Sequence, residues 1–81
     1  MSRRRITFRQ LEIFLAVASH RNFTKAAAAL HLTQPAVSLQ VKQIADTLGL
    51  PLFEQAGREL ALTGAGAEML NTARALDDLW S

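Results

Sequence analysis

The side chains in this chain that are best suited to chemistry form a polar set without an acid in the middle of the sequence. Gln34, Ser38 and Lys42 recur at intervals of four, and Pro35 and Leu39 follow the first two directly. Residues four apart share one face of a helix, so a helix here would present all five together. Glutamine can pair with adenine through two hydrogen bonds, serine can donate or accept, and proline or leucine can contact a thymine methyl group. The segment therefore fits the reading of base edges in duplex DNA, although a neutral solvated face would have the same composition.

Catalysis is not indicated by the sequence. The histidines are His20 and His31, each at the end of a predicted helix, and neither a nucleophile–base–acid set nor metal-ligand spacing accompanies them. The absence of cysteine rules out disulfides and Cys-based zinc sites. No apolar run approaches the ~18 residues that span a bilayer, and the basic start is no signal peptide. We expect a cytoplasmic protein that is not an enzyme and has no contact with a membrane.

The charge of this 81-residue chain, which is short enough for one small domain, is unevenly distributed. Up to Leu62 the chain has eight lysines and arginines and four acids, a net charge of +4. From Thr63 on it has one arginine and three acids, a net charge of −2. The positive part could bind a polyanion, and the acidic end suits a different contact.

The polar set is carried by a predicted helix over 33–48. Thr33 is a good N-cap, proline is tolerated in a first turn, and Gly49 is typical of a C-terminal cap. The apolar residues of this segment recur at 4, 3 and 4, and we expect them to face inward: Val37, Val41, Ile44 and Leu48.

The neighbouring elements are predicted to present this helix outward. The sequence predicts a first helix over 7–19 and a second helix that Thr24 caps and that ends at Leu30. The connector between the second helix and the helix over 33–48 is very short, so these two helices must cross at a steep angle. Such a helix can place its first turns in the major groove. A hairpin follows, with strands 52–55 and 59–62 and a turn at 56–58, and Thr63 then caps a helix that continues to the chain end.

Several charged or polar residues could contact the phosphate backbone, setting register and not sequence. Those at or near helix starts, where phosphate is favoured, or beside the polar face, are Arg9, Gln10, Thr24, Lys25 and Lys42. Arg58 at the hairpin tip could enter the minor groove, or it could pair with Glu59 or Glu54. Arg4 and Arg5 could add non-specific affinity or serve only to solubilise the N-terminus.

The last helix carries a heptad-like seam, with Met69, Ala73, Leu76 and Trp80 spaced 4, 3 and 4. In a monomer this seam would fold back onto the core, whereas in a homodimer it would pair with its symmetry mate. The dimer is favoured, because it would complete a thin core and present two reading helices to successive major grooves.

Taken together, five blocks of sequence resemble the N-terminal region of LysR-type transcriptional regulators. They are Phe8-Arg9-Gln10-Leu11, Asn22-Phe23-Thr24, Leu32 to Ser38, Gly49 to Glu54, and Leu62-Thr63. The resemblance implies a mainly α fold: a winged helix-turn-helix of three helices and a two-stranded hairpin over 1–62, then a dimerising linker helix over 63–81. It also implies a double-stranded DNA site that is an interrupted palindrome, and a tetramer in the full-length protein. No cofactor is expected in this part, because the co-inducer would bind an effector domain that is absent.

Residue by residue, Thr33, Gln34, Pro35 and Ser38 match the family's base-contacting helix, and Arg58 matches its wing contact. Many members have arginine where Leu39 stands, which suggests an apolar contact there. The segment 31–44 is similar to that of regulators of carbon-dioxide-fixation operons. The alternative is a winged-helix protein–protein interaction module, against which the basic charge and the acid-free face argue.

Overall fold

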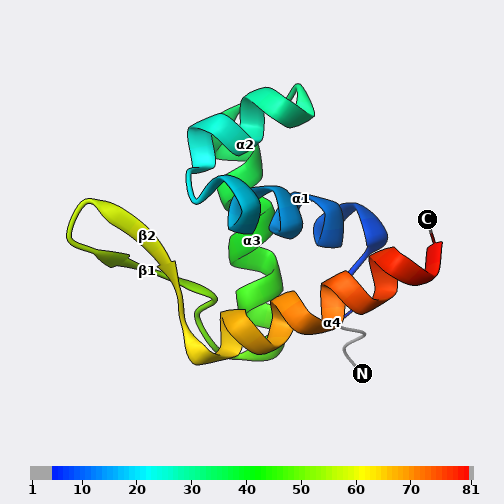
Figure 1. The fold of residues 1–81 in the computed structure, drawn as a ribbon. Coiled ribbons are helices and arrows are strands. Elements are labelled where there is room, and N and C mark those ends of the chain that lie inside the picture. Colours follow the sequence, from blue (N-terminus) through cyan, green and yellow to red (C-terminus); the bar gives the residue numbers. More distant parts are fainter. Residues whose placement is uncertain (1–4, 81) are drawn as a thin grey trace.

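The computed structural model describes residues 5–80, with Trp80 placed only as a helical residue, so the contacts predicted for Arg4 and for the Trp80 side chain lie outside the described part. Four helices and a two-stranded antiparallel hairpin confirm the predicted mainly α architecture (Figure 1). In chain order the elements are α1 (Phe8–His20), α2 (Phe23–Leu30), α3 (Gln34–Leu48), β1 (Phe53–Ala56), β2 (Glu59–Leu62) and α4 (Gly64–Trp80).

Both ends of α3 are where the sequence predicted them. The Thr33 hydroxyl accepts a hydrogen bond from the backbone N–H of Ala36 at 3.3 Å, and Gly49 ends the helix with φ +74°. At the start of α1, Thr7 and Gln10 form a reciprocal capping box, each side chain accepting from the other's backbone N–H at 3.0 Å.

The predicted N-cap of α2 was wrong. Asn22, and not Thr24, caps the helix, since the Asn22 side-chain oxygen accepts a hydrogen bond from the Lys25 backbone N–H at 2.8 Å. Thr24 is therefore the second residue of α2, where its hydroxyl is exposed. The residues that end α1 and α2, Arg21 and His31, both adopt the left-handed conformation, with φ of 50° and 59°.

The interior is built from two adjoining apolar clusters. One joins α1, α3 and α4 around Phe14, and the other joins α1, α2 and α3 around Val17; both residues are fully buried. Phe53 from β1 links the two, with its ring 5.4 Å from that of Phe14 and 5.8 Å from that of Phe23. No polar or charged residue of the described part is buried, so the core is held by apolar packing alone.

The hairpin turn is shorter than expected. Ala56 pairs with Glu59, so the turn consists of Gly57 and Arg58 instead of three residues. Gly57 has φ +65°, and glycine at the first central position is typical of the two-residue turns that match strand twist. The register sets Gln55 opposite Leu60.

The helix α4 begins against the loop that precedes the hairpin. The Thr63 hydroxyl donates to the Pro51 carbonyl at 2.6 Å and accepts from the Gly66 N–H at 3.0 Å, which confirms Thr63 as its cap. A β-carbon at Gly66 would stand 2.0 Å from the Leu52 carbonyl oxygen, so this glycine is required by packing. Among residues 5–80, no helix is both long and apolar enough to cross a membrane.

The inner face of α4 packs on the chain's own core, which corrects the predicted seam. Met69 and Ala73 are 9% and 1% exposed and belong to the cluster around Phe14. They are therefore unavailable to a second copy. Leu76 is only half-buried, and Leu79, which the seam did not include, is 79% exposed.

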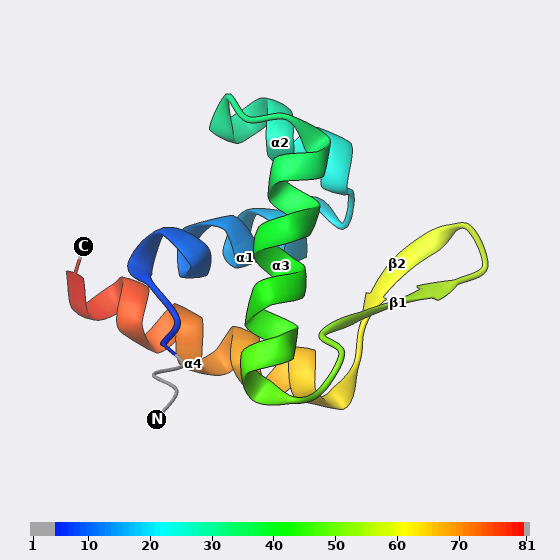
Figure 2. The same ribbon diagram turned by 180° about the vertical axis from the view of Figure 1, so that it is seen from behind.

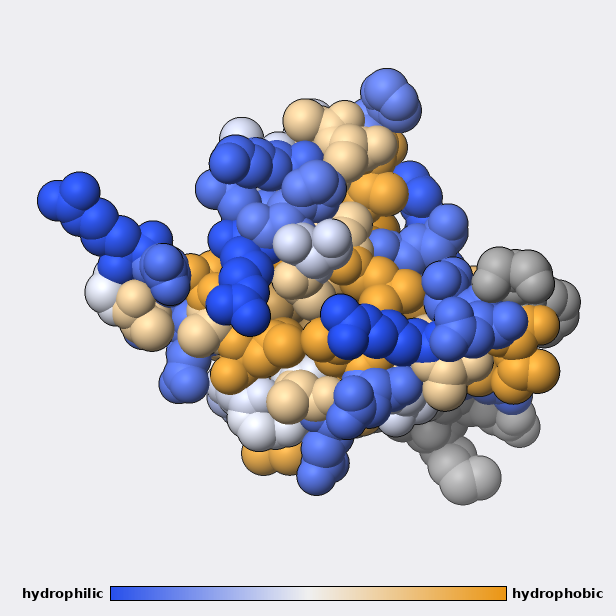
Figure 3. Space-filling view, in the orientation of Figure 1, coloured by the Kyte–Doolittle hydropathy of each residue, from blue (hydrophilic) through white to orange (hydrophobic). Residues whose placement is uncertain are grey.

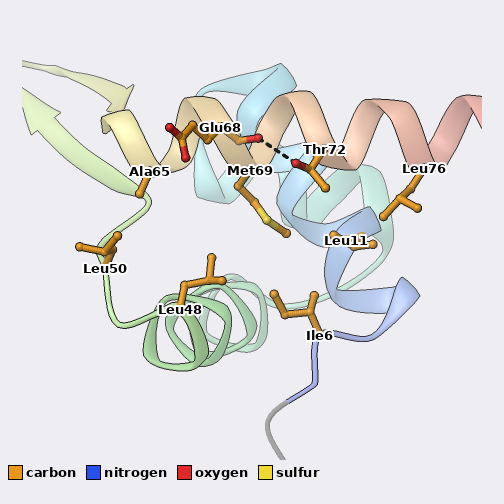
Figure 4. Close-up of a pocket in the computed structure, with 9 residues that line it drawn as sticks. All are labelled: Ile6, Leu11, Leu48, Leu50, Ala65, Glu68, Met69, Thr72 and Leu76. Atoms are coloured by element: carbon orange, nitrogen blue, oxygen red, sulfur yellow. Dashed lines mark hydrogen bonds between the residues drawn. The ribbon is translucent and has the colours of Figure 1, made fainter.

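The apolar stripe of α3 is also shorter than predicted. Val37, Val41 and Ile44 are buried, but Leu48 is 42% exposed. Leu48 lines a mainly apolar hollow between the end of α3 and α4. Ile6 and Leu50 line the same hollow and leave it open (Figure 4). The stripe therefore faces inward only where α1, α2 and α4 cover it.

Candidate nucleic-acid interface

The first turns of α3 form an uncovered face. In Figure 2 this helix runs across the front of the molecule, with α2 beside its start and the hairpin standing to one side. Gln34 and Pro35 are exposed, Leu39 is 53% exposed and Ser38 is half-buried. The face therefore has the exposure that base contact requires.

Within this face the polar side chains are already ordered. The Gln34 Nε2 donates a hydrogen bond to the Ser38 hydroxyl at 2.5 Å, one helical turn away. The Gln34 carbonyl oxygen and its second N–H stay available, and these are the two groups that adenine binds. Thr33, predicted to contact bases, is exposed at the cap position beside Gln34.

Two of the predicted phosphate contacts lie in exposed ion pairs. Lys42 Nζ is 3.1 Å from Asp46 Oδ2, and Arg9 is 3.8 Å from Glu12. All four side chains are more than half exposed, and such pairs contribute about 0–1 kcal/mol, so a phosphate can displace either carboxylate.

The other predicted phosphate contacts have different surroundings. Arg5, Lys25 and Arg58 are exposed and take part in no ion pair of the described residues, so Arg58 pairs with neither glutamate of the hairpin. The Gln10 amide, by contrast, donates to the side chains of Gln40 and Gln43 at 3.1 and 3.4 Å. Gln10 thereby fixes the start of α1 on α3.

The sequence prediction missed two residues at the turn between α1 and α2. Arg21 and Asn22 line a polar hollow together with the hairpin residues Gln55 and Arg58. Asparagine is as strong an N-cap as any residue, and this preference could have identified Asn22. Nothing local in the sequence indicates Arg21, because its role depends on the position of the hairpin.

A second hollow lies between α1 and α4. Its lining is apolar with an acid at each rim: Phe8, Leu11, Leu15, Ala73 and Leu76, flanked by Glu12 and Asp77. Phe8 is 58% exposed, and Figure 3 shows apolar surface at the end of α4 nearby. This region and the α3 face lie on different parts of the domain, so both can be occupied at once.

Comparison with known proteins assigns most of the chain to one family. The family model for the bacterial regulatory helix-turn-helix protein, lysR family, matches residues 8–67. A RuBisCO operon transcriptional regulator of Allochromatium vinosum is 51% identical over 71 residues, 88% of this chain and 24% of that protein. The transcriptional regulator CbbR of Rhodospirillum rubrum is 59% identical over 68 residues, 84% of this chain and 23% of that protein.

Among solved structures, the complex of the CbnR DNA-binding domain with DNA is similar, with a TM-score of 0.83 and 40% identity. The match covers 90% of this chain and 84% of that one. The chain spans about a quarter of the length of the curated relatives it matches, which are named as regulators of transcription and not as enzymes.

Proposed function

Because this chain belongs to the LysR family of bacterial regulatory helix-turn-helix proteins and forms a DNA-binding domain of that family, we propose that it reads a specific duplex site with the start of α3. In the major groove Gln34 pairs with an adenine, and Pro35 and Leu39 contact thymine methyl groups. Thr33 and Ser38 add hydroxyl contacts to neighbouring base edges or phosphates.

The observation that carries this proposal is the composition of the open face of α3. Val37, Val41 and Ile44 are buried on one side, while the opposite side carries no acid before Asp46. Asp46 in turn lies 3.1 Å from Lys42, which neutralises it. A polyanion can therefore approach the first three turns of the helix without repulsion.

Backbone contacts set the register of this reading. Arg9, Thr24, Lys25 and Lys42 bind phosphates, and Arg58 at the hairpin tip enters the minor groove beside the one that α3 occupies. Gln10 supports these contacts from within, since its hydrogen bonds hold α1 against α3.

Two copies of the chain bind together through the end of α4. Leu79, near the end of α4, is 79% exposed. Phe8, which is 58% exposed, lines the apolar groove between α1 and α4 together with the half-buried Leu76. Pairing across a two-fold axis would cover these residues and place two α3 helices in successive major grooves. The expected site is therefore an interrupted palindrome.

In the whole regulator, the expected setting is the cytoplasm of a bacterial cell and the control of a carbon-dioxide-fixation operon. The names of the relatives and their identity of 51% and 59% support this assignment. The match covers only 24% and 23% of these two relatives, and we expect a further domain of the whole protein to bind the small-molecule co-inducer.

Selection of bound DNA from a random pool tests the proposal. We expect enrichment of an interrupted palindrome, and a titration of the selected site should weaken steeply as salt rises, because bound phosphates release counterions. A fragment that enriches nothing and ignores duplex DNA in dilute buffer would contradict DNA reading, and would favour a protein-binding role for the same helix.

A further inference from the structure

Between the start of α2 and the hairpin lies a polar hollow that the base-reading face does not use. Figure 3 shows hydrophilic surface at the hairpin tip and over α2, with open space between them. The residues that line the hollow come from two segments more than 30 positions apart: Arg21, Asn22, Phe23 and Thr24 from the α1–α2 turn, and Gln55, Arg58 and Leu60 from the hairpin.

The hollow concentrates positive charge without a counter-ion. Arg21 and Arg58 line it from opposite sides, and the ion pairs of the described residues involve neither of them. Two guanidinium groups that share one hollow repel each other unless an anion lies between them. The charge therefore favours an anionic ligand with several acceptor oxygens.

The strand register keeps the acids of the hairpin away from this hollow. Successive side chains of a strand point to opposite faces, and Gln55 pairs with Leu60 on the face that lines the hollow. Glu54 and Glu59 occupy the alternate positions, so both carboxylates lie on the other face. An anion in the hollow meets donors and no carboxylate from the hairpin.

Neutral donors complete the lining on the α2 side. The Thr24 hydroxyl is exposed, and the first residues of a helix carry backbone N–H groups that have no partner inside the helix. Asn22 takes one of these groups, the N–H of Lys25. The others remain for a ligand, and the helix dipole favours a negative one.

The backbone at Arg21 gives an independent reason to look for a role of its side chain. Its φ of 50° and ψ of 37° lie in the left-handed region, where glycine is favoured and a β-carbon is a cost. An arginine at such a position gains nothing for the fold from its backbone geometry. What it adds is a guanidinium group at the mouth of the hollow.

We propose that this hollow binds one phosphodiester of the DNA backbone, with Arg21 as its main ligand, at the point where Arg58 on the far side passes the phosphate on its way into the minor groove. The inference rests on the proposed function. When α3 lies in a major groove and the hairpin enters the adjacent minor groove, the strand that separates the two grooves must cross between α2 and the hairpin. The hollow lies on that path.

Single-phosphate neutralisation tests the assignment on the site obtained by selection. Methylphosphonates are placed one at a time along each strand, and the affinity of the wild-type chain, of Arg21→Ala and of the control Arg74→Ala is measured. Wild type and the control should lose roughly tenfold at one phosphate beside the minor groove. Arg21→Ala should bind the unmodified site roughly tenfold more weakly and lose nothing further at that phosphate. If Arg21→Ala shows the wild-type pattern of losses, the assignment is wrong even though DNA reading stands.

A second variant separates binding from folding. Arg21→Gly removes the guanidinium and suits the left-handed backbone, so its melting temperature should be no lower than that of the wild type. Its affinity for selected and for random duplexes should fall together, and the slope of log affinity against log salt should fall by about 0.9. Arg21→Lys should retain that slope. A lowered melting temperature with unchanged affinity would assign Arg21 a structural role instead and overturn the proposal.

Discussion

Gln34 and Ser38 lie one turn apart on α3, and their hydrogen bond of 2.5 Å orients the glutamine amide before any ligand arrives. A side chain that is free in solution loses rotamer freedom when it binds, and this loss lowers affinity. Ser38 therefore has a second role besides its proposed DNA contact, because it orients the Gln34 carbonyl oxygen and remaining N–H for the proposed pairing with a base.

The first prediction concerns base reading. Gln34→Ala is expected to cost about 1–3 kcal/mol on the selected site and to relax the preference at one base pair, because it removes a bidentate contact. Competition titrations with single-base variants of the site measure both effects. Gln43→Ala, on the same helix but beyond the reading face, should leave base preference unchanged. Equal loss of affinity on random DNA would show that Gln34 does not read bases.

The second prediction concerns the phosphate contacts. Lys42→Ala and Arg9→Ala should weaken binding to all sequences alike and lower the salt slope by about 0.9 each, because each removes one charge from the backbone contact. Asp46→Asn serves as the matched control, since it frees Lys42 from a carboxylate 3.1 Å away and should tighten binding. A loss confined to the selected site would contradict the backbone role.

At the scale of elements, the start of α4 depends on two glycines with opposite requirements. A β-carbon at Gly66 would stand 2.0 Å from the Leu52 carbonyl oxygen and 2.9 Å from the Leu62 side chain, whereas Gly64 has nothing within 4 Å. The close approach at Gly66 lets α4 dock against the loop before the hairpin. Backbone atoms cannot move aside as a flexible side chain can.

The third prediction follows from this difference. Gly66→Ala should destabilise the domain by about 3 kcal/mol or more, through displacement of α4, while Gly64→Ala should stabilise it by about 0.5–1 kcal/mol, since alanine favours helix. Urea unfolding followed by circular dichroism gives both free energies. Comparable stabilities of the two variants would mean that α4 does not need the contact at Leu52.

Element ends could be predicted from the sequence where one residue type settles the geometry. Thr33, Gly49 and Thr63 were placed correctly, because a hydroxyl cap and a left-handed glycine have few alternatives. The start of α2 was misplaced because Asn22 and Thr24 are both good caps two positions apart. The choice between them depends on how Phe23 packs against Phe53, which lies 30 positions further along the chain.

At the scale of the whole molecule, one side of α4 packs on the core and another side is exposed. Its inner residues, Met69 and Ala73, pack with Phe14. The 4-3-4 spacing that suggested a partner helix is the same whether the covering surface belongs to a second copy or to the chain itself. The sequence alone could not decide between them. The exposure of the first turns of α3 was easier to predict, because it needs no partner element.

The fourth prediction separates association from folding. Leu79→Glu should shift the chain towards monomer, because Leu79 is 79% exposed in the single chain and its burial is expected only between copies. Met69→Ala should instead lower the free energy of unfolding by about 2–5 kcal/mol, since Met69 is 9% exposed in the core. Equilibrium sedimentation and urea unfolding measure the two effects. An unchanged mass for Leu79→Glu would contradict pairing through the end of α4.

The close seating of α4 on its own domain has a mechanical consequence. Gly66, Met69 and Ala73 hold this helix against the loop and the core beneath it. We therefore expect α4 and α3 to move together as one rigid body. In the proposed dimer, a rotation of one α4 against the other would therefore rotate the two α3 helices by the same amount, which would change the bend of the bound DNA and leave the base contacts of each α3 unaltered.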